Sequence, residues 1–259
     1  MRWGLSISLS GELAEPKVLA EIAVLAEEAG WDGVFVWDHL WNRTLAPFAD
    51  PFVTVAAIAI ATRRINVGTL VTVLPRRRPQ LVAQSTATLD RLSDGRMVLG
   101  LGIGVDRYGE YSAFEEPAAD DRARARALDA GVDVLKQMLA GEPVTGADGR
   151  ITTLAGVQRP RVPIWIAGTT RYTAGPRRVR RHGVEGLALV GADTWSPDDV
   201  TRALRAGGLS VGEIDLALVG GVHPDSHALA EVGATWCIPE ILPGATASDA
   251  RALAGTSPR

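Results

Sequence analysis

The feature of this sequence that most constrains its fold is a regular alternation between short apolar runs and segments of helical periodicity. The apolar runs are too short for helices and are separated by glycine, proline and charged residues, as strands are. The run over 34–37 is apolar at nearly every position, which is typical of a parallel strand buried on both faces. We therefore expect eight strands, over 3–8, 34–37, 65–71, 97–101, 163–167, 186–190, 214–219 and 234–238.

Between these runs, apolar residues recur every three or four positions, as they do on one face of a helix. After Pro16, the residues Leu19, Ile22 and Ala26 share such a face, and Gly30 supplies the glycine that commonly ends a helix. Further helices are expected over 51–62, 79–92, 121–139, 176–181 and 197–206, with a stunted one over 226–231 and a connecting insertion over 143–160.

Eight strands alternating with helices predict an α/β fold of the (β/α)8 TIM-barrel type. The alternative is an open doubly wound sheet, which usually has about five to seven strands. No repeat, low-complexity tract or long linker divides the chain, so we expect one domain over 1–259. Residues 207–259 contain two short strands and little helix, which predicts a shortened C-terminal third.

Composition argues against several classes of function. A net charge of -3 gives no reason to expect nucleic acid or an anionic membrane as partner. The lone Cys237 excludes a disulfide framework within the chain, and Pro224 argues against a single helix that would pair His223 with His227, so we predict no metal site. No targeting segment is visible, and the apolar stretch over 53–61 is too short to span a bilayer, so we expect a cytoplasmic protein.

The active site of such a barrel lies at the C-terminal ends of its strands. His39 follows the second run, and an imidazole can move protons at neutral pH, so His39 is the candidate catalytic residue. Asp38 could orient His39 or cap the next turn, and His39 itself could be a polar residue of the rim. The chain has 7 Trp against 4 Phe and 3 Tyr, and Trp37, Trp41 and Trp236 are expected to line a substrate pocket.

Two other strand ends carry weaker signals. Small and hydroxyl residues over 168–170 precede a helix start, which favours either an anion site or an ordinary turn. Gly102 belongs to an alternating glycine pattern that does not fit the dinucleotide fingerprint, and it indicates a close approach between backbone and ligand. The arginines over 76–78 are interpreted as a solvated loop rather than a binding patch.

Several segments resemble those of the bacterial luciferase-like flavin-dependent oxidoreductases. They cover nearly the whole chain in the family's order, over 26–33, 37–40, 67–79, 88–96, 163–168 and 233–236. The resemblance implies a barrel that binds FMN or the deazaflavin coenzyme F420, with His39 facing the cofactor and a cis peptide at Leu70–Val71. The cofactor contacts that it implies, together with those expected from the strand ends, are Asp38, Leu70, Val71, Thr72, Gly102, Gly168, Thr169, Thr170 and Gly191.

The leading hypothesis is an enzyme, an FMN- or F420-dependent oxidoreductase or monooxygenase that acts on a small organic substrate. The motifs do not choose between the two cofactors. A non-catalytic flavin-binding barrel is the alternative, and a lyase for phosphorylated substrates is disfavoured because the two lysines, Lys17 and Lys136, fall on helices. We also expect a separate flavin reductase as partner and a homodimer, since the helix over 51–62 is apolar around most of its circumference.

Overall fold

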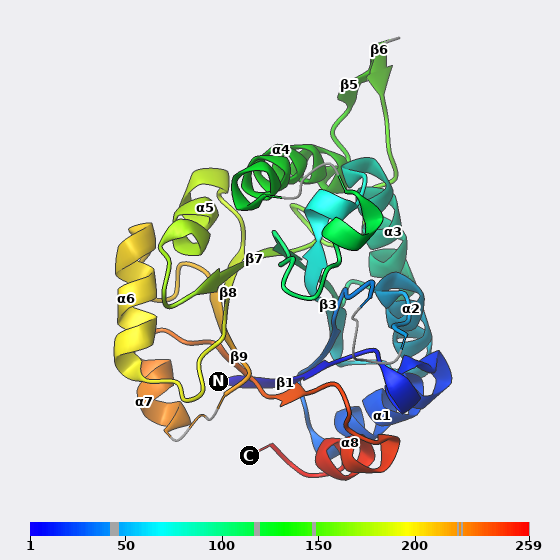
Figure 1. The fold of residues 1–259 in the computed structure, drawn as a ribbon, viewed down its shortest axis with the longest axis vertical. Helices are drawn as coiled ribbons and strands as arrows, with labels where there is room; N and C mark the ends of the chain where they lie inside the picture. The colour runs from blue at the N-terminus through cyan, green and yellow to red at the C-terminus, as the bar shows by residue number, and fades with distance from the viewer. Residues whose placement is uncertain (42–46, 117–119, 147–148, 222, 224, 259) are drawn as a thin grey trace.

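The computed structural model describes residues 1–41, 47–116, 120–146, 149–221, 223 and 225–258, and its strands close into a parallel barrel (Figure 1). Neighbouring strands pair in chain order around the barrel, and the last one pairs with the first, so the open doubly wound sheet is excluded and the (β/α)8 prediction is confirmed. The barrel strands are β1 (Arg2–Ile7), β2 (Gly33–Val36), β3 (Asn66–Val73), β4 (Met97–Gly102), β7 (Ile164–Thr169), β8 (Gly186–Val190), β9 (Asp215–Val219) and β10 (Trp236–Ile238).

The last barrel strand is split into two pieces. β10 pairs with the start of β1, where Trp236 lies opposite Arg2. The chain then breaks at Pro239 and continues as β11 (Glu240–Ile241), which pairs with the end of β1 at Ser6. One piece therefore closes the barrel near its N-terminal end, and the other reaches its C-terminal mouth.

Helices surround the barrel and pack on the outer face of the strands (Figure 1). Their starts and ends carry recognisable caps: Asp50 accepts two backbone N–H bonds at the start of one helix, and Gly30 ends another with φ +93°. The helices are α1 (Pro16–Ala29), α2 (Pro51–Ala61), α3 (Pro79–Leu92), α4 (Asp121–Ala140), α5 (Ala174–His182), α6 (Pro197–Gly207), α7 (Ser226–Glu231) and α8 (Ala247–Ala254). None of those in the described ranges is long and apolar enough to cross a membrane.

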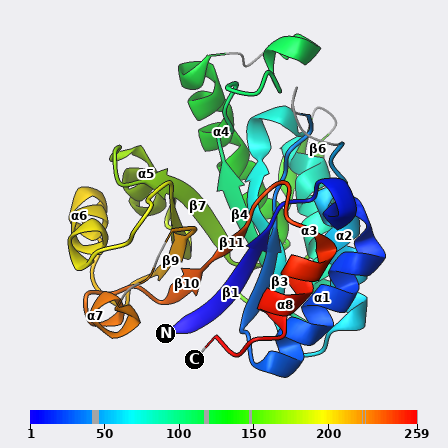
Figure 2. The same cartoon turned by 60° about the horizontal axis from the view of Figure 1, so that its bottom comes forward.

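Two elements differ from the sequence-based expectations. The segment predicted as a plain insertion contains an antiparallel hairpin, β5 (Val144–Gly146) and β6 (Gly149–Ile151), which projects from the barrel (Figure 1). The C-terminal third is not poor in helix, because a capping box between Thr246 and Asp249 starts α8. Figure 2 shows α8 beside α1, and the Trp31 indole N–H, from the turn after α1, donates to the Ala254 carbonyl at 3.1 Å.

Aromatic side chains fill the N-terminal half of the barrel interior. The ring centroids of Phe35, Trp165 and Trp236 lie 5.6–5.7 Å from one another, and Arg2 covers the Trp236 ring at 4.4 Å. The prediction that Trp236 lines a substrate pocket is therefore wrong. Trp236 begins its strand rather than ending it, so its fully buried side chain packs at the opposite end of the barrel from the mouth.

Candidate active site

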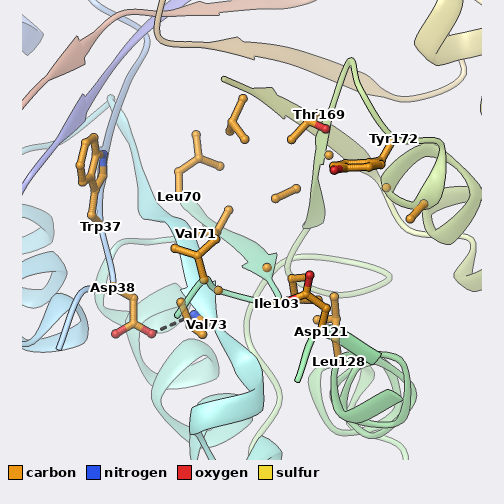
Figure 3. A pocket seen from close by; sticks show the side chains of 18 of the residues that line it. Trp37, Asp38, Leu70, Val71, Val73, Ile103, Asp121, Leu128, Thr169 and Tyr172 are labelled. Atoms are coloured by element: carbon orange, nitrogen blue, oxygen red, sulfur yellow. Dashed lines mark hydrogen bonds between the residues drawn. The ribbon is translucent and has the colours of Figure 1, made fainter. Parts of the chain in front are cut away.

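A cavity of about 470 Å³ opens at the C-terminal mouth of the barrel. Figure 3 shows Trp37 on one side of it, Thr169 and Tyr172 on the other, and Leu70 and Val71 between them. The Leu70–Val71 peptide is cis, as the family resemblance implies. The predicted site residues that line the cavity are Trp37, Asp38, His39, Leu70, Val71, Gly102, Gly168 and Thr169.

Four other predicted residues lie outside the cavity wall: Trp41, Thr72, Thr170 and Gly191. The buried Thr72 hydroxyl is 2.7 Å from the hydroxyl of Thr69, so its hydrogen bond is made within the strand. The Trp41 ring packs edge-on against Phe114 at 6.2 Å. Of the three tryptophans predicted for the pocket, only Trp37 is on its wall.

His39 is held by a buried carboxylate. Its ring Nδ1 lies 3.1 Å from Oε1 of Glu110, which also accepts the Leu40 backbone N–H at 2.7 Å and lies 3.0 Å from Nη1 of Arg76. Burial alone would raise the pKa of Glu110, but the contacts with His39, Arg76 and Leu40 outweigh it and lower that pKa to about 2. Glu110 is therefore a carboxylate at neutral pH and can only accept, so the Nδ1–H group of His39 donates a hydrogen bond to it.

Asp38 does not orient His39; it joins the ends of β2 and β3. Its carboxylate accepts the Val73 backbone N–H at 2.9 Å and two N–H groups of Arg77 at 2.8 and 2.7 Å. Burial by itself would lower the pKa of Arg77, yet the bidentate contact with Asp38 raises it above its ordinary value. Arg77 is thus held in its charged form, and its contact with Asp38 fixes the strand ends that carry His39 and Val71.

The interpretation of the arginines over 76–78 as a solvated loop is wrong for two of them. The Arg76 side chain is only 5% exposed; it pairs with Glu110 and donates to the backbone carbonyl of Asp38. Arg77 forms an ion pair with the Asp38 carboxylate. The physical reason is that two carboxylates meet at this corner of the barrel, and both require a cation when water is removed.

Sequence reasoning missed Glu110 because it lies in an irregular segment after β4. That segment is anchored by Tyr111, whose hydroxyl donates to the Ile103 carbonyl at 2.8 Å and whose ring lies 4.7 Å from the Arg124 guanidinium. Burial raises the pKa of Tyr111 to about 12, so the phenol stays neutral. His39 and Glu110 are 71 positions apart, and no fixed spacing joins them. The only available signal was an acidic residue that follows a strand end, as Glu110 does.

One polar group on the opposite side of the cavity is unsatisfied. The buried Thr169 hydroxyl has no hydrogen-bond partner among the residues that the structure describes. It lies close to the start of α5, where a Cβ atom on Gly175 would come within 2.5 Å of the Gly168 Cα. A Cβ atom on Gly102 would likewise lie 2.7 Å from Val71, so both glycines are needed for the close packing of neighbouring elements at the cavity. The arrangement fits a large ring compound with a phosphate near Thr169.

The comparisons with known proteins agree with the geometry of this site. The sequence matches the family model of luciferase-like monooxygenases over residues 4–230. The F420-dependent glucose-6-phosphate dehydrogenase of Beutenbergia cavernae is 35% identical over 196 residues, which are 72% of this chain and 55% of that protein. The enzyme of the same name from Kineococcus radiotolerans is 32% identical over 229 residues, which are 82% of this chain and 65% of that protein.

The chain therefore spans less than two thirds of the length of these curated relatives. Among solved structures, a monooxygenase from Streptomyces bottropensis superimposes with a TM-score of 0.74 at 19% identity. The superposition covers 98% of this chain and 96% of that one. At this identity the likeness supports the fold.

Proposed function

Because this chain belongs to the luciferase-like monooxygenase family, we propose that it is an oxidoreductase that binds a flavin-type cofactor at the mouth of its barrel. The observation that carries the proposal is the pair formed by the partly exposed His39 and the buried Glu110 beside a mostly apolar cavity. The names of the two curated relatives favour coenzyme F420 over FMN. With F420 the reaction is a hydride exchange with a small organic substrate; with FMN it is an oxygenation that needs a separate flavin reductase.

The residues at the mouth fit such a cofactor in three places. Leu70 and Val71 would support one face of the ring, and Gly102 leaves room for it. The unpartnered Thr169 hydroxyl would donate to a phosphate oxygen at the start of α5. When bound, the cofactor supplies a ring that takes or gives a hydride.

His39 would move the proton that accompanies this hydride. In the neutral tautomer that donates from Nδ1 to Glu110, the lone pair lies on Nε2, to which no described residue is hydrogen-bonded. In the oxidation of an alcohol, Nε2 takes the hydroxyl proton while the C–H bond releases its electron pair as hydride. Glu110 then offsets the charge of the imidazolium, and Trp37 and Ile103 help to exclude water.

The experiment is a fluorescence titration with F420 and FMN, followed by an assay of F420 reduction with glucose 6-phosphate and a panel of secondary alcohols. We expect saturable binding of one cofactor. The His39→Ala variant should keep that binding and lose roughly 10²- to 10⁴-fold in turnover. Failure of both cofactors to bind would overturn the proposal, and binding without any turnover would favour a non-catalytic flavin-binding barrel.

We also propose that the protein forms a homodimer through α2. Phe52 and Val55 of this helix are buried, yet Val53 and Ile60 are 63% and 64% exposed, so apolar side chains lie on its outer face as well. Sedimentation should give a dimer for the wild type and a monomer for the double variant Val53→Asp, Ile60→Asp. A monomeric wild type would contradict this arrangement.

A further inference from the structure

One acidic side chain of the cavity has no part in the network around His39. Glu240 begins β11, where it pairs with Ser6 at the C-terminal end of β1, and it lines the same cavity as His39 and Trp37. The split of the last strand at Pro239 brings it there. Glu240 therefore reaches the cavity from β11, next to β1, whereas the Glu110 network is held by the ends of β2 and β3 and by the segment after β4.

Every other acidic residue on the cavity wall has a charged partner. Asp38 pairs with Arg77, Glu110 with Arg76 and His39, and Asp121 with Arg124. By contrast, no residue that the structure describes gives the Glu240 carboxyl a hydrogen bond or an ion pair. Its burial, without a compensating contact, raises its pKa above the ordinary value.

Two indole N–H groups at this end of the barrel donate to acceptors other than Glu240. The indole N–H of Trp37 donates to the Ser6 hydroxyl at 2.7 Å, and the indole N–H of Trp195 donates to the Gly220 carbonyl at 2.7 Å. On the side toward β9, Gly220 makes room for the carboxylate, since a Cβ atom there would lie 2.2 Å from Oε2 of Glu240. The fold accommodates the carboxylate at this place and, among the described residues, gives its oxygens no donor.

Glu240 is half-buried on the cavity wall, and a carboxylate there that lacks a protein partner keeps its hydrogen-bonding capacity for a ligand. We propose that Glu240 is a specificity-determining residue that binds a hydrogen-bond donor of the substrate, a hydroxyl or a protonated amine. The inference rests on the proposed function in one respect: it takes this cavity as the substrate site. It adds the chemical class that the cavity selects.

The test compares three small ring compounds that differ in one group. Cyclohexylamine carries a charged donor, cyclohexanol a neutral donor, and methoxycyclohexane an acceptor alone. Their dissociation constants are measured by ligand-observed NMR at pH 8, on the protein alone and on the protein loaded with reduced F420. The variants are Glu240→Met and Glu240→Gln, and Glu28→Gln on the exposed face of α1 is the matched control.

The wild type and the control should bind the amine or the alcohol about tenfold or more tightly than the ether, since hydrogen bonds to charged groups contribute this much. Glu240→Met should abolish the preference. Glu240→Gln distinguishes the two donors, because its amide oxygen still accepts from the alcohol but no longer attracts the ammonium. No preference in the wild type, or a preference that survives Glu240→Met, would overturn the inference.

Cofactor titrations on the same samples keep the two proposals apart. If neither F420 nor FMN binds but the preference for donors depends on Glu240, the proposed function falls and this inference stands. If a cofactor binds and the preference for donors is missing, the proposed function stands and this inference falls. Melting temperatures confirm that each variant is folded, and Glu240→Gln keeps the size of the side chain should Glu240→Met not fold.

Discussion

The two sides of the cavity differ in how their carboxylates are paired. On the side of β2 and β3, two carboxylates and two arginines lie within one hydrogen-bonded network, and nearly every oxygen has a donor. On the side of β8 and β11, Val190 and Glu240 face the cavity, and the carboxylate has no partner in the described part of the chain.

The difference corresponds to two roles: the paired side fixes the position of His39, and the unpaired side is available to bind a ligand. A paired network keeps its geometry whether or not a ligand is present, and such rigidity suits the side that carries His39. An unpaired group gains its first partner when a ligand arrives, and this suits recognition. Each substitution below changes one of these two sides and tests whether the paired and the unpaired side still differ.

The largest effect is expected from removing a cation of the paired side. Arg76→Met leaves the buried Glu110 carboxylate without its strongest counter-charge, which should lower the free energy of unfolding by roughly 3 kcal/mol or more. Urea denaturation measures it. Arg78→Met, in the same arginine run, is the control and should change the stability by under about 1 kcal/mol; equal losses in both variants would contradict the paired network.

The acid sensitivity of the fold should depend on the same side. The pKa of Glu110 is lowered in the folded state to about 2, so its contribution is fully present above the unfolded pKa, near 4.5, and is lost as the pH falls from there toward 2. The shift corresponds to about 3 kcal/mol. Denaturation curves at several pH values should show a steeper loss for the wild type than for Glu110→Gln, and parallel losses would disprove the assignment.

A smaller effect is expected at the two threonine hydroxyls. Thr169→Val removes an unpartnered hydroxyl, so it should leave the stability unchanged while weakening cofactor binding by roughly fivefold. Thr72→Val removes a hydroxyl that is bonded to Thr69, so it should lower the stability by about 1 kcal/mol. Thermal melts and cofactor titrations on both variants should give these opposite patterns.

The smallest change in stability should come from the unpaired side. Glu240→Gln removes a charge that has no partner in the described structure, so its unfolding free energy should stay within about 0.5 kcal/mol of the wild type or rise. Urea denaturation beside Glu110→Gln makes the comparison direct. A loss as large as that of Glu110→Gln would mean that Glu240 is structural.

Local pattern was sufficient to predict the barrel, because the strand runs and helix faces are each set by nearby residues. It could not place Trp236, since a strand residue lies at the mouth or at the far end depending on the register with its neighbours. It also could not join His39 to Glu110 or recognise the burial of Arg76, because those contacts exist only after the strands are assembled. The place of His39 on the cavity wall could be predicted because it depends on one strand end, and its catalytic role stays a prediction.

Because of the break at Pro239, the two pieces of the last barrel strand have different roles. β10 completes the circle of strands, while β11 carries Glu240 to the mouth and contributes only two residues to the sheet. A change in β11 can therefore alter the wall of the cavity while the seam between β1 and β10 stays intact. For protein engineering, this makes the short segment after Pro239 a replaceable part through which the barrel could be adapted to new substrates.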